Sequence, residues 1–209
     1  MWDMAQVLTR RQKQEETRER LLDAATRVFA RRGYQQATLD EIAKEAGFTI
    51  GAVYSNFAGK EELFLALADR EVDQRVAEIR AVGDAAERGE QPGAQAADQF
   101  REFLERDPDW PLLFYEFWSF GVRNPKTHQE FARRRQAVRD ALAETLERVA
   151  AQLGFRPRFP APQLATAIGA TLNGLAFERA ADPDAIPDEV FAEFIAAILA
   201  CSVAAPSDG

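Results

Sequence analysis

Cysteine and histidine are almost missing from this chain. Its 209 residues include one cysteine, Cys201, and one histidine, His128. A single cysteine cannot form an internal disulfide, and with one histidine it cannot make a usual zinc site. No Gly-rich phosphate loop follows a strand, and no motif pairs a nucleophile with a base. We therefore expect no catalytic site, no metal and no cofactor, with a carboxylate-only enzyme as the remaining alternative. The lone thiol agrees with a reducing cytoplasm.

Long apolar runs and strand-like alternation are also absent. No apolar run reaches the roughly 18 residues of a membrane-spanning helix, so we expect no membrane segment. The first residues, Met1 to Gln6, lack the apolar segment of a secretory signal. Between the Gly and Pro residues that interrupt the chain, apolar residues recur with helical spacing. This predicts an all-α fold of about nine helices in two domains, at 1–59 and 60–209.

Charge is distributed unevenly along the chain. The net charge is −8, but residues 1–60 hold 10 Lys and Arg against 8 Asp and Glu, whereas residues 61–209 hold 16 against 26. A mildly basic head in front of an acidic body would direct one end of the molecule towards a polyanion.

The first three helices have clear boundaries. One apolar stripe comprises Leu21, Leu22, Ala25, Val28 and Phe29. Gly33 is expected to end that helix. Thr38 and Glu41 form a capping box before Ile42, Ala43 and Ala46, and Gly47 ends the second helix. Thr49 caps a third helix, in which Val53 and Phe57 share a face. Further helices are predicted at about 60–82, 95–106, 109–123, 126–153, 162–180 and 187–203.

The two short helices at 38–46 and 49–57, with a tight turn at Gly47 and Phe48, form a helix-turn-helix. The small Gly51 and Ala52 allow close approach to base edges, and Ser55 and Asn56 carry short polar groups that read them. Thr38, Thr49, Tyr54 and Lys60 lie around the helix ends, where phosphates are held. Plain capping by the threonines and half-buried packing of Tyr54 are the alternatives.

The segment from about residue 17 to 66 resembles the DNA-binding head of the TetR family. The residues that carry the resemblance include Gly51, Tyr54, Phe57 and Lys60. The resemblance implies phosphate contacts at Thr38, Thr49, Tyr54 and Lys60, and base-edge or groove contacts around Ile50, Gly51, Ala52, Ser55 and Asn56. Ile50 departs from the polar or basic residue often found there, so it either touches a thymine methyl or packs.

Before the first helix, residues 1–16 contain Arg10, Arg11 and Lys13. Such an arm can reach a minor groove or a flanking phosphate, and the alternative is a disordered, solvated tail.

The C-terminal part holds 11 of the 15 phenylalanines beyond residue 99. Residues 110–120 are apolar nearly all round, so the predicted helix is buried on every side, either in the core or along a cavity. TetR resemblance implies an effector cavity there. The expected ligand residues are Phe103, Trp110, Leu113, Phe114, Phe117, Trp118, Asn173 and Phe177. Glu116 needs a partner inside this run, either a cationic ligand or one of Arg123, His128 and Arg179; His128 is expected at the surface.

The last two predicted helices carry small and apolar stripes. One comprises Ala165, Gly169, Leu172 and Ala176, and the other Phe191, Phe194, Ile195, Ile198 and Leu199. Internal packing explains such stripes, while the resemblance implies a four-helix homodimer interface. We therefore predict a TetR-type repressor that a small hydrophobic effector releases from palindromic operator DNA, with an activator or a partner-controlled regulator as the alternative.

Overall fold

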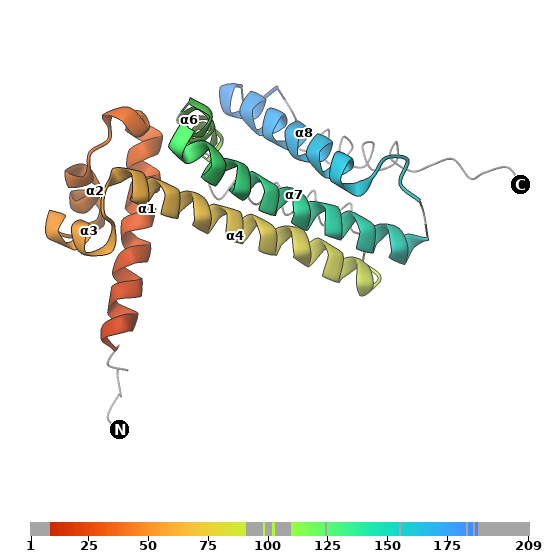
Figure 1. Cartoon of the computed structure of the whole chain (residues 1–209), viewed down its shortest axis with the longest axis horizontal. Helices are drawn as coiled ribbons and strands as arrows, with labels where there is room; N and C mark the ends of the chain where they lie inside the picture. The colour runs from red at the N-terminus through yellow and green to blue at the C-terminus, as the bar shows by residue number, and fades with distance from the viewer. Residues whose placement is uncertain are drawn as a thin grey trace, which may run out of the picture. The chain divides into compact units, whose positions relative to one another are not determined.

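The computed structural model describes residues 9–90, 98, 102, 110–123, 125–154, 156–182, 184–185 and 187. Every regular element in these ranges is a helix, which confirms the all-α prediction. The seven helices are α1 (Arg10–Gln36), α2 (Leu39–Ala46), α3 (Ile50–Asn56), α4 (Lys60–Glu87), α6 (Trp110–Arg123), α7 (Pro125–Leu153) and α8 (Ala161–Ala181) (Figure 1). The predicted helices at 95–106 and 187–203 lie almost wholly outside the described residues. The chain groups into two units, Met1–Arg70 and Glu71–Gly209.

The first unit is held together by the apolar faces that the sequence predicted. All five residues of the predicted α1 stripe are buried, as are Ile42, Ala43 and Ala46 of α2 and Val53 of α3. Three aromatic rings close this core, with centroids 5.1 Å apart between Phe29 and Phe64 and 4.5 Å apart between Tyr34 and Phe64. Edge-to-face and tilted ring contacts of this kind stabilise the core beyond what the burial of the rings contributes.

Gly33 interrupts the first helix but does not end it, which corrects the prediction. Its φ of 71° and ψ of 159° are not helical, yet α1 continues beyond it to Gln36. Glycine adopts a positive φ without the Cβ penalty of other residues. The carbonyl oxygen of Gly33 then accepts a hydrogen bond from the Ala37 N–H at 3.2 Å. The glycine therefore makes a kink, and the chain resumes helical bonding before α2.

The helix α4 is longer than predicted, ending at Glu87 and not near Val82. Gly83 lies inside it and is buried, and a Cβ added there would lie 2.8 Å from a guanidinium nitrogen of Arg148. That guanidinium reaches Asp84 at 2.6 Å and Glu87 at 2.8 Å. The glycine leaves room for the α7 arginine, which explains why it does not act here as a helix stop.

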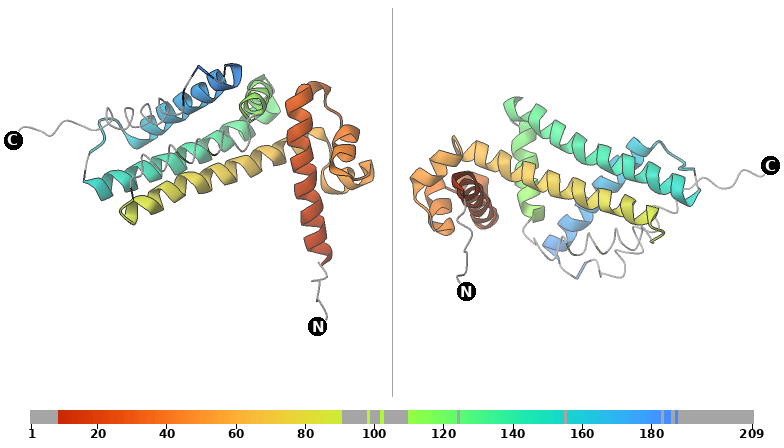
Figure 2. Two further views of the ribbon diagram at one scale, coloured as in Figure 1. Left: turned by 180° about the vertical axis from the view of Figure 1, so that it is seen from behind. Right: turned by 90° about the horizontal axis from the view of Figure 1, so that it is seen from below.

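The second unit is built on α7, which packs against α6 and α8 and runs beside α4, where Thr145 donates to the Ile79 carbonyl oxygen (Figure 2). On the α6 side, Gly121 allows a close approach, because an added Cβ would lie 2.8 Å from the ring of Phe131. On the α8 side, Ala165 is fully buried in a small-residue cluster with Ala143 and Ala161.

Two predictions for this unit need correction. Helix α6 is not buried on every side: its exposed large apolar side chains are Leu112, Tyr115, Trp118 and Val122, at 46, 45, 47 and 43% exposure. Its buried Phe117 and Gly121 face Phe131 of α7, whereas the four exposed side chains lie on other sides of the helix. The predicted stripe of α8 packs only partly inside the chain: Ala165 and Ala176 are buried, and Gly169 and Leu172 are half-buried. The second predicted stripe, from Phe191 to Leu199, lies outside the described residues.

Candidate nucleic-acid interface

Helix α3 is buried on one side and exposed on another. Val53 has no exposed surface and Phe57, which follows the helix, is 2% exposed, so these two residues anchor it. Elsewhere on the helix, Tyr54 is 60% exposed and Ile50 is 38% exposed. Burial of large apolar side chains is the usual outcome in a stable head. An exposed tyrosine and isoleucine on a short helix therefore indicate a contact surface for another molecule.

Local hydrogen bonds set where α2 and α3 begin and how they turn. The Thr38 hydroxyl accepts from the Glu41 N–H at 3.2 Å, and the Glu41 carboxylate accepts from the Thr38 N–H at 3.1 Å, as the predicted capping box requires. Gly47 ends α2 in the left-handed conformation, with φ 74° and ψ 28°. Thr49 caps α3 by accepting from the Ala52 N–H at 3.4 Å. The predicted helix-turn-helix is therefore formed.

The two polar residues expected to read bases are engaged locally. The Ser55 hydroxyl and the Asn56 amide each donate to the Ala52 carbonyl oxygen at 2.8 Å. Both bonds are within one turn of α3, and the Asn56 amide also donates to the Ser55 hydroxyl at 3.3 Å. These bonds orient the two side chains, and none of them uses the Asn56 carbonyl oxygen as acceptor. Gly51 and Ser55 are exposed, whereas Ala52 and Asn56 are half-buried.

Arginines of α1 hold the ends of the other two helices, which the sequence analysis missed. Arg18 donates to the Asn56 carbonyl oxygen at 3.2 Å, and Arg20 donates to the Ala46 carbonyl oxygen at 3.1 Å. Their guanidinium groups also lie over the rings of Phe57 and Phe48, at 4.4 and 4.6 Å from the centroids. Cations at helix C-termini complement the helix dipole and satisfy its last carbonyls. In the sequence, Arg18 and Arg20 lie off the apolar stripe of α1, but nothing there indicates which carbonyl oxygens they contact.

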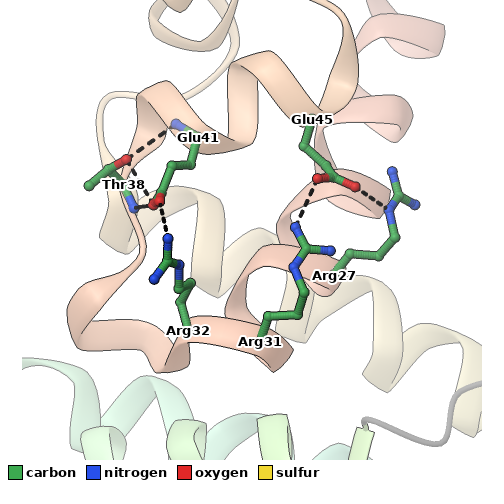
Figure 3. A network of polar contacts seen from close by, with 6 residues as sticks. All are labelled: Arg27, Arg31, Arg32, Thr38, Glu41 and Glu45. Atoms are coloured by element: carbon green, nitrogen blue, oxygen red, sulfur yellow. Dashed lines mark hydrogen bonds and ion pairs between the residues drawn. The ribbon is translucent and has the colours of Figure 1, made fainter.

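A second group of α1 arginines holds α2 through carboxylates, as Figure 3 shows. Arg27 and Arg31 pair with Glu45 at 3.0 and 2.8 Å. Arg32 pairs with Glu41 at 3.3 Å, beside the capping box. The arginines keep the pKa of Glu45 below its usual value, and the bonds from Thr38, followed by Arg32, do so for the pKa of Glu41.

Lys60, predicted to hold a phosphate, makes three hydrogen bonds inside the head. Its ammonium group donates to the carbonyl oxygens of Tyr34, Gln35 and Ala37 at 2.7, 3.1 and 3.0 Å. It also lies 4.7 Å from the centroid of the Tyr34 ring. An ammonium group has three donors, and all three are used here. The first residue of α4 is thereby tied to the connection between α1 and α2.

The basic residues before the first stripe are helical, contrary to the tail alternative. Helix α1 begins at Arg10, and a second capping box joins Thr9 and Gln12 at 2.8 and 3.3 Å. Arg10, Arg11 and Lys13 are exposed. Within the described part of the chain, no side chain forms an ion pair with these three. Figures 1 and 2 show the first turns of α1 extending past α2 and α3.

The predicted ligand residues are divided among several surfaces of the second unit. Leu113 and Phe117 are buried towards α7, where Phe117 meets Phe131 at a ring distance of 5.3 Å. Phe177 of α8 packs against Tyr115 at 4.2 Å. Half-buried residues of the set are Trp110, Phe114 and Asn173, while Trp118 is exposed. Phe103 lies outside the described residues. Glu116 is half-buried and His128 is exposed, the latter as predicted.

Membrane-spanning helices and clusters of metal ligands would indicate other classes of function. No described helix has the length and apolar character needed to cross a membrane. Across the described ranges, no three His, Cys, Asp or Glu side chains gather as metal ligands.

Comparison with known proteins agrees with a helix-turn-helix head on a helical body. Residues 21–67 match the family model described as bacterial regulatory proteins, tetR family, and residues 94–203 match that of the BetI-type transcriptional repressor, C-terminal. The second match covers more than half of the chain. The chain therefore belongs to the TetR family of DNA-binding transcriptional regulators, and it is not an enzyme.

Individual relatives cover different shares of the chain. The HTH-type transcriptional repressor AcnR of Corynebacterium diphtheriae is 30% identical over 169 residues, which is 80% of this chain and 83% of AcnR. The HTH-type transcriptional activator FasR of Mycolicibacterium smegmatis is 33% identical over 134 residues, 64% of this chain and 60% of FasR. The chain thus spans less than two thirds of FasR. The solved structure of FadR from Bacillus subtilis in complex with stearoyl-CoA shares the fold, with TM-score 0.68, 17% identity, and coverage of 89% of this chain and 97% of FadR.

Proposed function

We propose that this chain represses transcription by binding a palindromic operator as a homodimer, and that a small, mainly hydrophobic effector releases it. The observation that carries the proposal is the open face of α3, where Tyr54 and Ile50 are exposed on a helix anchored by Val53 and Phe57. Such a helix, held by a firm head, is suited to a major groove.

The roles we assign on this face follow from position. Thr38 and Thr49 lie at the starts of α2 and α3, where a hydroxyl and the first N–H groups can hold a phosphate. Tyr54 projects from the middle of α3 and is assigned to a phosphate as well. Ile50 is assigned to a thymine methyl. The remaining contacts in the groove are assigned to Gly51, Ala52, Ser55 and Asn56.

The direction of regulation rests on the relatives. AcnR is named a repressor and the matched C-terminal model is a repressor model, whereas FasR is named an activator. The greater coverage of AcnR favours repression. An activator with the same head is the second candidate, and the FasR similarity is what supports it.

Selection of bound DNA from a random pool, with the purified full chain, tests the proposal. We expect enrichment of an inverted repeat, and we expect the Ile50→Ala variant to change base preference in each half-site. A promoter–reporter carrying the selected site then gives the sign of regulation. Higher reporter output with the protein present would replace repression by activation. Failure to enrich any inverted repeat would overturn operator binding by a homodimer.

A further inference from the structure

Three successive arginines occur on α7, at 133, 134 and 135, and the helix turns them in different directions. Successive residues of an α-helix point about 100° apart, so the three cannot all face water. The Arg133 side chain is 71% exposed and pairs with Glu130. The Arg134 side chain is 7% exposed and reaches the same carboxylate at 3.2 Å. Arg135, mostly buried, is the residue without such a carboxylate.

The surroundings of Arg135 are apolar on one side and cationic on the other. Its guanidinium lies over the ring of Phe114, 5.1 Å from the centroid. Phe114 in turn lies 6.5 Å from the ring of Trp110 in the same helix, α6. Burial, together with the positive charge of nearby Arg139, lowers the pKa of Arg135. Within the described residues, Arg135 forms no hydrogen bond or ion pair, although residues 61–209 hold 26 carboxylates against 16 basic residues.

The contact with the Phe114 ring uses none of the N–H donors of the guanidinium as hydrogen bonds. A guanidinium carries its N–H donors in one plane, where a carboxylate or phosphate accepts two of them in parallel. A mostly buried cation without a partner costs free energy in the absence of a ligand. Residues that lower stability in this manner are a common feature of binding sites.

We propose that Arg135 binds the anionic group of the effector, whose apolar body lies against Phe114 and Trp110. The effector is therefore an amphipathic carboxylate or phosphate. This inference rests on the proposed function, since it concerns the effector of the same regulator, and it narrows the earlier expectation of a hydrophobic compound to one with an anionic head.

Four probes with the same twelve-carbon chain test the charge requirement: dodecanoate, dodecyl phosphate, dodecanol and dodecyltrimethylammonium. Each is titrated below its micelle concentration into the full chain without DNA, with tryptophan fluorescence and calorimetry as readouts. We expect the wild type to bind at least one anion about ten- to a hundredfold more tightly than dodecanol, as charged hydrogen bonds provide. The tighter of the two anions identifies the head group as carboxylate or phosphate.

Matched variants assign the effect to one side chain. Arg135→Gln should remove the anion preference, Arg135→Lys should keep part of it, and Arg133→Gln, which removes the same charge from an exposed position, should keep all of it. Without probe, Arg135→Met should raise the Tm by a few degrees, roughly 2–5 °C, and Arg133→Met should not. The Tm measurement also shows that the variants are folded.

Several results would overturn the assignment. They are an anion preference that persists in Arg135→Gln, equal binding of dodecanol and both anions by the wild type, and no binding of either anion. These measurements are made without operator, so they stand apart from the DNA selection. An anion preference without an enriched inverted repeat would overturn the proposed regulation and retain the binding site.

Discussion

The ammonium nitrogen of Lys60 lies 2.7 Å from the carbonyl oxygen of Tyr34, at the end of α1. Two further carbonyl oxygens, of Gln35 and Ala37, complete its donors. The same lysine belongs to the family pattern that implies a phosphate contact. The two roles compete for one ammonium group, because binding a phosphate requires it to release at least one carbonyl.

Replacing this lysine separates the two roles. Lys60→Met should lower the Tm of the head, because three carbonyl oxygens lose their donor, and those of Tyr34 and Ala37 are part-buried. The slope of log affinity against log salt should stay nearly unchanged, since no phosphate contact is lost. The measurements are thermal melting and DNA binding at several salt concentrations. A slope that falls by about one per head, with Tm unaltered, would establish the phosphate contact instead.

The first turn of α1 carries the cations that are available to DNA. Arg10, Arg11 and Lys13 are exposed, whereas the later arginines of α1 bind carbonyls or carboxylates of the head. Replacing the three with alanine should weaken binding to all DNA sequences and reduce the salt slope by up to about three per head. Binding isotherms at several salt concentrations give the slope.

A charge-matched control removes Arg133, Arg156 and Arg158 from the second unit. This variant has the same net charge as the α1 variant but should keep the wild-type slope. Equal effects of both triple variants would show that net charge alone is responsible, and would rule out a contact of the first turn with the backbone of DNA.

Much of the head could be predicted from local sequence. The stripe of α1, the Thr38 capping box and the anchor residue Val53 each depend on residues a few positions apart, and the structure contains all of them. Gly33 and Gly83 show the limit. Gly33 was expected to end the first helix, and the fourth helix was expected to stop near residue 82, just before Gly83. In the structure Gly33 makes a kink, and Gly83 lies inside α4 and makes room for Arg148. Whether a glycine ends a helix depends on which side chain arrives from elsewhere in the fold.

The hydrogen-bond partners of individual side chains could not be predicted from the sequence for the same reason. Lys60 meets carbonyls that lie 23 to 26 positions away. Arg135 differs from its two neighbours only in the direction it takes from α7. The apolar character of α6 was correct, but its full burial was wrong, because Trp118 and Leu112 lie on sides of the helix that stay exposed.

The ion pairs between α1 and α2 predict how the head responds to acid. Hydrogen bonds from Arg27 and Arg31 lower the pKa of Glu45 from 4.5. A lowered folded-state pKa contributes stability above the unfolded value, and the contribution disappears as pH falls through the folded value. Glu45→Gln should therefore lower the Tm near pH 7, by roughly 1–3 °C for an exposed pair, and the difference should become smaller at an acidic pH below 4.5.

Melting curves at the two pH values, recorded for the wild type and the variant, provide the check. Glu15→Gln is the control, since it removes an exposed carboxylate of α1 that forms no ion pair within the described residues. A Tm difference for Glu45→Gln that is as large in acid as at neutral pH would show that the effect is not electrostatic.

The outer face of α8 provides the test of the homodimer. Its exposed small residues are Thr166, Ala167, Ala170 and Gly174, spaced so that they share one side of the helix. This is a different face from the one predicted, which packs on α7. Small residues let two helices approach closely, so a charged side chain at the centre of the face should be buried without a partner. Ala170→Glu should therefore convert the dimer to monomer at micromolar concentration, measured by light scattering. It should also weaken operator binding, because two linked heads are needed for two half-sites.

Ala132→Glu, at an exposed position of α7, adds the same charge and should remain dimeric. A dimeric Ala170→Glu variant with unchanged DNA affinity would place the interface elsewhere, and a monomeric wild type would contradict the homodimer itself.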